Sequence, residues 1–183
     1  MDTIFVLSSG LPPSGVAVVR ISGARSRFAI ETICGSAPAP RRASLRRMRD
    51  PRDGSLIDEG LCLWFPGGES FTGEDSAEFH IHGGPAVVRA LLEVVGRLEG
   101  LRMAEAGEFA RRAFSNGGID LTEAEGLADL IAAHTEAQRR QAVAQSSGSL
   151  RDKLEAWRGR VGRPRAPVAG GFQFFGGGRR SAG

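Results

Sequence analysis

The chain has 183 residues, of which 41% are hydrophobic and 25% are charged, as in a soluble globular protein with one domain and a modest extension. It contains no run of 18 uncharged apolar residues, so no membrane span is expected. Asp2 stands where a secretory signal would carry a basic residue, which favours a cytoplasmic location. Six arginines and no acid follow Glu155, whereas residues 1–155 hold 18 bases and 21 acids. The net charge of +3 is therefore poor evidence that the body of the protein binds nucleic acid.

Strand and helix signals alternate along the first 118 residues. Short apolar or β-branched runs bounded by Gly, Pro and Ser predict strands, and apolar residues at helical spacing predict helices. Strands are expected at residues 3–8, 16–22, 57–65, 76–82 and 102–105, with one more around 43–48 within an otherwise loop-like stretch. Helices are expected at residues 24–34, 86–98 and 106–114. The pattern predicts an α+β domain with a mixed β-sheet and flanking helices over residues 1–118.

A helical pattern begins after residue 118 and continues to residue 158. Thr122 and Glu125 have the spacing of a capping box, so Thr122 is expected to cap the first helix. Apolar residues then recur at helical spacing as far as Ala144, and the pattern weakens at residues 146–148. Residues 119–158 therefore predict one or two helices.

Residues 159–183 contain eight glycines and no acid, and they show no sustained apolar period. Such a composition predicts a disordered Gly/Arg-rich segment. Three interpretations remain open: a flexible tail, a basic arm that binds nucleic acid, or out-of-frame translation of a GC-rich gene.

Glu78, His80 and His82 alternate with Phe79 and Ile81, so the three titratable side chains share one face of a strand. Three interpretations of this face are open. Two histidines at this spacing can chelate a metal. A carboxylate can accept two parallel N–H bonds from a heterocycle with an amine beside a ring N–H. The face can also be a polar surface with satisfied hydrogen bonds.

Arg20 lies inside the apolar run of residues 16–21, where a buried cation needs a carboxylate partner. Glu78 is a candidate partner, either in a structural ion pair or in a ligand site. Gly83 and Gly84 precede a helix, as in an anion-binding turn, although two glycines also mark ordinary turns. Cys34 and Cys62 lack metal-ligand spacing and are expected to be buried free thiols.

An arginine cluster at residues 41, 42, 46, 47 and 49 is interpreted as a solvated loop or, alternatively, as an RNA-binding patch. No Gly-x-x-x-x-Gly-Lys-Ser/Thr motif occurs in the chain, so a phosphate-binding P-loop is not expected.

Three strings resemble the N-terminal part of the bacterial tRNA-modification GTPases called MnmE or TrmE. They occupy residues 15–23, residues 70–85 and residues 106–125, and they occur in the order and spacing of that family. The resemblance covers residues 2 to about 157.

The resemblance implies a folate-binding fold like that of tetrahydrofolate-dependent aminomethyltransferases in residues 1–118. It also implies a homodimer formed by this domain, and a bound 5-formyltetrahydrofolate as the one-carbon source. By position, Arg20 and Glu78 match the family's folate-contacting arginine and glutamate. The third folate contact of the family is a lysine, and Gly118 occupies its position here, so weaker folate binding is expected.

Complete family members modify carbon 5 of the tRNA wobble uridine together with the flavoprotein MnmG (GidA). GTP, Mg²⁺ and K⁺ belong to their G domain, whose motifs are absent from this chain, so GTP hydrolysis by this chain alone is not expected. Two alternatives remain open: a non-functional truncated gene product and a free-standing RNA-binding protein.

Overall fold

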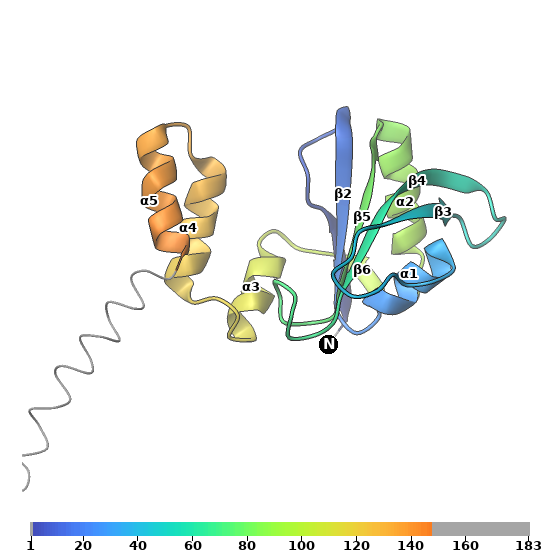
Figure 1. Ribbon diagram of the computed structural model, residues 1–183, viewed down its shortest axis with the longest axis horizontal. Helices are drawn as coiled ribbons and strands as arrows, with labels where there is room; N and C mark the ends of the chain where they lie inside the picture. Colours follow the sequence, from blue (N-terminus) through green and yellow to red (C-terminus); the bar gives the residue numbers. More distant parts are fainter. Residues whose placement is uncertain (1, 148–183) are drawn as a thin grey trace, which may run out of the picture. The chain divides into compact units, whose positions relative to one another are not determined.

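The computed structural model describes residues 2–147, which fall into two compact units (Figure 1). The first unit extends to Ile119 and the second begins at Asp120. The first unit combines one mixed sheet with helices, which confirms the predicted α+β class. Its strands are β1 (Thr3–Leu7), β2 (Ser14–Ser22), β3 (Ser44–Arg49), β4 (Leu56–Phe65), β5 (Ser76–Gly83) and β6 (Leu101–Met103). Its helices are α1 (Ser26–Cys34), α2 (Pro85–Gly96) and α3 (Glu108–Ser115).

The strands form one sheet in the order β3-β4-β5-β2-β1-β6. Neighbouring strands are antiparallel except β6, which pairs in parallel with β1. The two centrally placed strands β2 and β5 are distant in the sequence, and their register sets Arg20 opposite Glu78. The sheet topology thus brings together two residues that are 58 positions apart.

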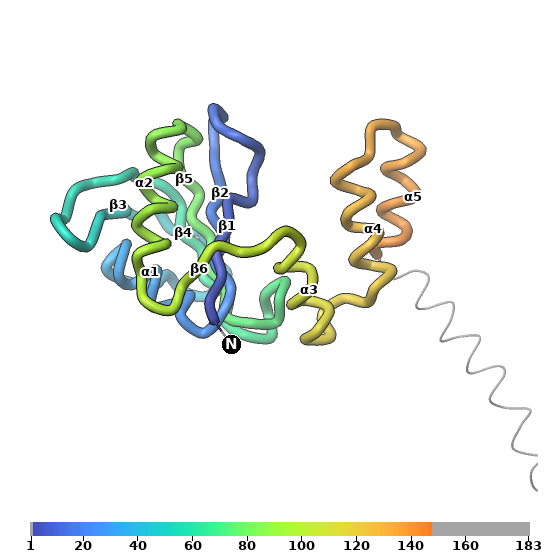
Figure 2. Tube along the Cα trace, turned by 180° about the vertical axis from the view of Figure 1, so that it is seen from behind, coloured from blue at the N-terminus to red at the C-terminus, as the bar shows by residue number. Residues whose placement is uncertain are grey.

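Helices α1 and α2 pack on the same face of the sheet, and Figures 1 and 2 show both on one side of β2 and β5. Val19, Ile21, Phe79 and Ile81 point toward them and are at most 2% exposed. Burying such a side chain contributes roughly 1.5–3 kcal/mol relative to leaving it in water. The apolar residues of the alternating strand β5 therefore face the core, and its polar residues face the other side of the sheet, as predicted.

Gly83 and Gly84 each have a structural role at the junction of β5 and α2. Gly83 ends β5, and a Cβ there would collide with the backbone carbonyl of Ser14 on β2. Gly84 is an extended N-cap residue and is followed by Pro85 in the first turn of α2. Because Gly83 has no side chain, the first residues of β2 can pair with the last residues of β5.

The second unit contains α4 (Leu121–Ala132) and α5 (Glu136–Ser146) among its described residues. The predicted Thr122–Glu125 capping box is wrong. Asp120 caps α4: its carboxylate accepts a bond from the Glu123 backbone N–H at 2.8 Å, and the Glu123 carboxylate accepts one from Asp120 N–H at 2.7 Å. Asp and Thr are both favourable N-cap residues. Asp120 is the N-cap because its backbone is extended and the helical conformation begins at Leu121.

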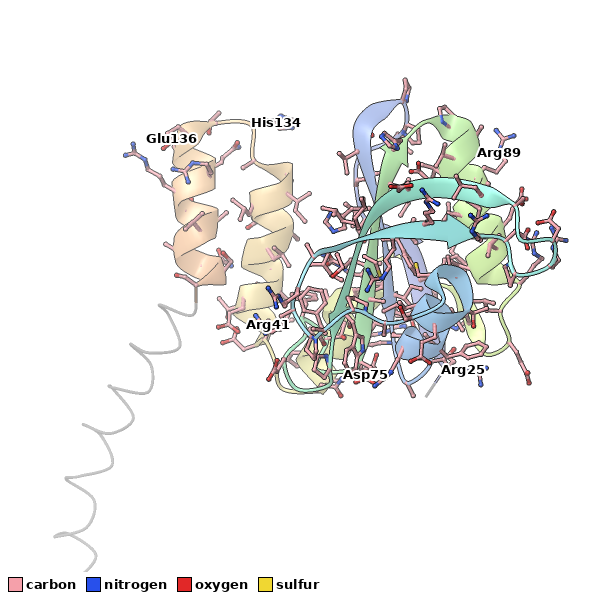
Figure 3. The ribbon with its side chains drawn as sticks, turned by 45° about the vertical axis from the view of Figure 1, so that its right-hand side comes forward. Arg25, Arg41, Asp75, Arg89, His134 and Glu136 are labelled. Carbon is pink, nitrogen blue, oxygen red and sulfur yellow. The ribbon has the colours of Figure 1, made fainter. Side chains whose placement is uncertain are left out.

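A second capping box separates the two helices. Thr135 Oγ1 accepts a hydrogen bond from Gln138 N–H, and Gln138 Oε1 accepts one from Thr135 N–H. Figure 3 shows the resulting break, with His134 in the connection and Glu136 at the start of α5. Gly126 lets the helices approach closely, since a Cβ there would lie 2.6 Å from the Ser146 nitrogen.

Apolar side chains of this helix pair remain in solvent within the described residues: Ile131 is 81% exposed and Leu121 is 61% exposed. No helix of residues 2–147 is long and apolar enough to cross a membrane. The predicted helical residues 148–158 and the predicted disordered segment 159–183 lie outside the described residues.

Candidate functional site

The sheet face opposite α1 and α2 carries the polar residues singled out in the sequence. Strand pairing places the residues of this face in rows across the sheet. One row contains Leu63 of β4, Glu78 of β5, Arg20 of β2 and Val6 of β1. The next row contains Leu45, Leu61, His80 and Val18. On this face, Arg20, Glu78 and His80 are therefore flanked on both sides by apolar residues of β4, β2 and β1.

Arg20, Glu78 and His80 form a hydrogen-bonded set at the centre of this face. Arg20 Nε donates a hydrogen bond to Glu78 Oε1 at 3.0 Å, and Arg20 Nη2 lies 2.9 Å from the same oxygen in an ion pair. His80 Nε2 lies 2.9 Å from Glu78 Oε2. The predicted pairing of Arg20 with Glu78 is present. The predicted burial of Arg20 is only partial, because its side chain is 35% exposed on a face that α1 and α2 leave open.

Glu78 is the most enclosed member of the set, with 17% of its side chain exposed. Burial raises the pKa of its carboxyl group, but the hydrogen bond from His80 and the charge and hydrogen bond of Arg20 outweigh this effect. The net pKa of Glu78 lies below its ordinary value. At neutral pH the group is therefore a carboxylate, which only accepts hydrogen bonds.

His82 does not join this set. Its ring Nδ1 lies 2.9 Å from Asp58 Oδ1, its backbone N–H donates to Asp58 Oδ2, and its side chain is 74% exposed. Within residues 2–147 no group of three or more His, Cys, Asp or Glu side chains is arranged to hold a metal ion. The structure favours the two non-metal interpretations of the strand face.

Gly118 lies in the turn after α3 and is exposed. Its N–H donates to the Ala113 carbonyl at 2.9 Å, and its nearest non-local neighbour is the Phe71 carbonyl. Having no side chain, it adds no group to the Arg20–Glu78 pair. A Cβ at Gly118 would meet the Ala113 and Phe71 carbonyl oxygens at 3.4 and 3.5 Å, and its φ is not in the left-handed region, so a larger residue fits there.

A second polar cluster, which the sequence reasoning did not identify, joins the end of β2 to α3. Ser22 Oγ lies 2.7 Å from Thr72 Oγ1 and donates to Glu74 Oε2 at 2.7 Å. Glu74 in turn accepts from Arg112 Nη1 at 3.1 Å. Arg112 is only 7% exposed and also pairs with Glu108 at 3.1 Å.

The same cluster extends to the start of the chain. Arg112 donates to Asp2 Oδ1 at 2.8 Å, and Arg102 of β6 pairs with both Asp2 and Glu108. The bond from Arg102 lowers the pKa of Glu108 to about 2, against the opposing effect of burial and with help from the Glu105 N–H and Arg112. The sequence offered one signal for this cluster, namely the i,i+4 spacing of Glu108 and Arg112 on a short helix.

The arginine cluster at residues 41–49 is a solvated loop only in its first half, where Arg41 and Arg42 are exposed and lie outside the strands. Its second half is β3, so its side chains alternate between the two faces of the sheet. Arg47 pairs with Glu59 at 2.9 Å, and Arg49 donates to the Gly54 carbonyl at 2.8 Å. Arg46 points the other way, toward α1. The arginines of β3 therefore do not form a single basic surface.

Comparison with known proteins agrees with the architecture of the first unit. Residues 3–118 match the family model described as GTP-binding protein TrmE N-terminus. The chain is 61% identical over 173 residues to a tRNA modification GTPase MnmE of Brucella anthropi and 58% identical to that of Brucella canis. It is also 57% identical to a zebrafish (Danio rerio) protein named 5-taurinomethyluridine-[tRNA] synthase subunit GTPB3, mitochondrial.

These matches cover 94% of this chain and therefore extend beyond residue 158, so the expectation that the family resemblance ends near residue 157 is wrong. The chain spans only 39% of the length of the two Brucella proteins and 35% of the zebrafish protein.

Proposed function

The chain belongs to the MnmE/TrmE family of tRNA-modification GTPases and corresponds to its N-terminal part, and on this basis we propose that its first unit binds a reduced, formylated folate at Arg20 and Glu78. The observation that carries the proposal is the pairing of these two residues, at 2.9–3.0 Å, on the open face of the sheet. 5-Formyltetrahydrofolate is the proposed ligand.

The chemistry of Glu78 supports this ligand. A carboxylate offers about four lone-pair sites, of which Arg20 and His80 use some. The remaining positions can accept the amine and ring N–H of a pterin, while the Arg20 guanidinium can donate to a carbonyl or carboxylate of the same ligand. Leu61, Leu63 and Val18 beside the pair supply apolar surface for the flat ring.

We further propose that the first unit forms a homodimer. Val16 and Leu45 are 57% and 60% exposed, and both lie on the sheet face that α1 and α2 leave open. Exposed apolar residues gathered on one face are typical of an association surface. A second copy of the chain is the proposed occupant.

For the complete protein we propose GTP-dependent tRNA modification, the function that the names of the Brucella relatives state. We further propose a cytoplasmic location, with the flavoprotein MnmG and tRNA as partners. GTP, Mg²⁺ and K⁺ would act in a G domain, for which this chain has no P-loop motif. The contribution of the described residues would be to hold the one-carbon donor.

Calorimetric titration of the chain with 5-formyltetrahydrofolate tests the folate proposal. Arg20→Ala and Glu78→Ala are each expected to weaken binding by about tenfold or more, since each removes a charged hydrogen-bonding group worth about 1.5–3 kcal/mol. Arg47→Ala is the matched control, because Arg47 lies on the same sheet face and pairs with Glu59 instead. Circular dichroism would verify that every variant is folded.

Two results would contradict the proposal. One is undetectable binding at millimolar ligand by the folded unmodified chain. The other is a loss of affinity in Arg47→Ala as large as in Glu78→Ala.

A further inference from the structure

His80 lies between two apolar neighbours and bonds to a single charged one. Strand pairing sets it opposite Val18 of β2 and Leu61 of β4, neither of which has a side chain that can form a hydrogen bond. Within residues 2–147 the hydrogen bond of the His80 ring goes to Glu78, with Nε2 2.9 Å from Oε2. The His80 side chain is 30% exposed, so the ring lies at the surface of the open sheet face.

The charge of Glu78 determines which nitrogen of His80 carries a proton. A carboxylate only accepts hydrogen bonds, so Nε2 of His80 must be the donor in the bond between them. In the neutral ring Nδ1 is then an acceptor. His80 therefore supplies a donor of fixed direction, two residues from Glu78 on the same strand.

The two oxygens of Glu78 are held by residues of two different strands. Arg20 of β2 contacts Oε1 through Nε and Nη2, and His80 of β5 contacts Oε2. The last torsion of a glutamate side chain is broad and roughly two-fold, so a carboxylate held at one oxygen alone can turn about it. The contact with His80 fixes the plane of the carboxylate and hence the direction of its remaining lone pairs.

The same bond supports the ionised form of Glu78. Burial raises the pKa of its carboxyl group, and the hydrogen bond from His80 is the largest effect that lowers it, ahead of the charge and hydrogen bond of Arg20. Arg20 from β2 and His80 from β5 are the charged or titratable side chains in contact with Glu78 among the described residues. Orientation and ionisation of the carboxylate thus depend on the same neighbour.

We propose that His80 is the positioning residue of the Arg20–Glu78 site and fixes the Glu78 carboxylate in the orientation that accepts two parallel N–H bonds from the ligand. This inference rests on the proposed folate-binding function. A contact of this kind needs both acceptor oxygens in the plane of the two donors, which a freely turning carboxylate does not provide. His80 therefore acts on the ligand through Glu78.

Carbon-13 nuclear magnetic resonance of the Glu78 carboxyl carbon, recorded on the full chain without ligand, tests the action of His80 on Glu78. In His80→Leu the carboxyl group is expected to titrate at a higher pH than in the unmodified chain, because its ionised form loses a hydrogen bond. His80→Gln should restore the lower value, since the amide N–H can donate to the same oxygen. An unchanged titration of Glu78 in His80→Leu would overturn the proposal, whether or not the chain binds folate.

Calorimetric titration with 5-formyltetrahydrofolate tests the consequence for the ligand. His80→Leu is expected to weaken binding about three- to tenfold and His80→Gln about twofold or less, since one hydrogen bond is lost in the first variant and kept in the second. His82→Leu is the matched control, because His82 lies on the same face of β5 but is 74% exposed and bonds to Asp58. Circular dichroism would verify that each variant is folded.

Equal losses of affinity in His80→Leu and His82→Leu, or no recovery in His80→Gln, would overturn the positioning role. Undetectable folate binding by the unmodified chain would contradict the proposed function instead. In that case the titration of Glu78 without ligand still decides whether His80 holds the carboxylate.

Discussion

At the scale of single residues, the charged groups of the first unit are stabilised in two different ways. Glu78 is a half-buried carboxylate held by two neighbours on an open sheet face. Glu108 and Arg112 are more deeply buried and satisfy each other together with Asp2 and Arg102. The Glu78 carboxylate therefore keeps acceptor positions on the open sheet face that a ligand can use. The charges of the Glu108–Arg112 cluster are paired with one another, which suits a structural role.

Gly118→Lys is expected to strengthen binding of 5-formyltetrahydrofolate about fivefold, corresponding to about 1 kcal/mol for one added charged contact. The position accepts a side chain, because a Cβ there makes only ordinary van der Waals contacts. Calorimetry of this variant beside Gly15→Lys, another exposed glycine, measures the effect. An equal gain in both variants would mean that the added charge acts non-specifically.

Arg112→Met is expected to lower the free energy of unfolding by about 3–5 kcal/mol, since it leaves the buried carboxylate of Glu108 without one of its partners. Arg111→Met, the neighbour on the same helix, has a 62% exposed side chain and should change stability by about 0.5 kcal/mol or less. Urea denaturation of both variants provides the comparison. Similar losses would show that the cluster does not hold α3.

The same cluster predicts a direction of pH dependence. Glu108 has a folded-state pKa of about 2, below the value of about 4.3 expected in the unfolded chain. A lowered carboxyl pKa contributes stability above the unfolded value, and that contribution is lost as pH falls from about 4.5 toward 2. The urea midpoint should therefore decrease over this range, and it should decrease less in Glu108→Gln. An unchanged slope in that variant would contradict the assignment.

At the scale of elements, the sheet depends on close backbone contact between β4 and β5. Gly60 lies on β4 beside His80, and a Cβ there would collide with the His80 carbonyl oxygen. Since β4 supplies Leu61 and Leu63 to the candidate site, its spacing from β5 determines the shape of that face.

Gly60→Ala is expected to destabilise the first unit by about 1–3 kcal/mol, the usual cost of overpacking. Gly15→Ala is the control, because nothing lies within 4 Å of a Cβ at Gly15, which is also in a strand. Thermal unfolding followed by circular dichroism distinguishes the two variants. Equal midpoints would show that the strands can separate without cost.

Most strands and helices of the first unit could be predicted from the sequence because they carry their own apolar period, whereas the arginine-rich β3 does not. The core half of β5, Phe79 and Ile81, followed from alternation alone. The cap of α4 could not be chosen in this way, since Asp120 and Thr122 both offer an oxygen three residues before a glutamate. The burial of Arg112 also escaped prediction, because its partners Asp2 and Glu74 come from distant segments that only the fold brings together.

At the scale of the whole molecule, the first unit is proposed to bind folate and to associate with a second copy. Leu45→Lys is expected to weaken this association, because it places a charge on the open sheet face. Leu11→Lys serves as the control, since Leu11 is 88% exposed and lies outside the sheet. Sedimentation equilibrium should show twice the mass of one chain for the control and a lower average mass for Leu45→Lys. A monomeric unmodified chain would contradict the dimer.

Direct contact of Arg20 and Glu78 with the folate underlies the proposed function. Nuclear magnetic resonance of the ¹⁵N-labelled chain, titrated with 5-formyltetrahydrofolate, tests it most directly. The largest chemical-shift changes are expected at the Arg20 side-chain Nε–H and at the backbone amides of residues 18–20 and 78–80. Saturable shifts confined to other parts of the chain, or none at millimolar ligand, would contradict it.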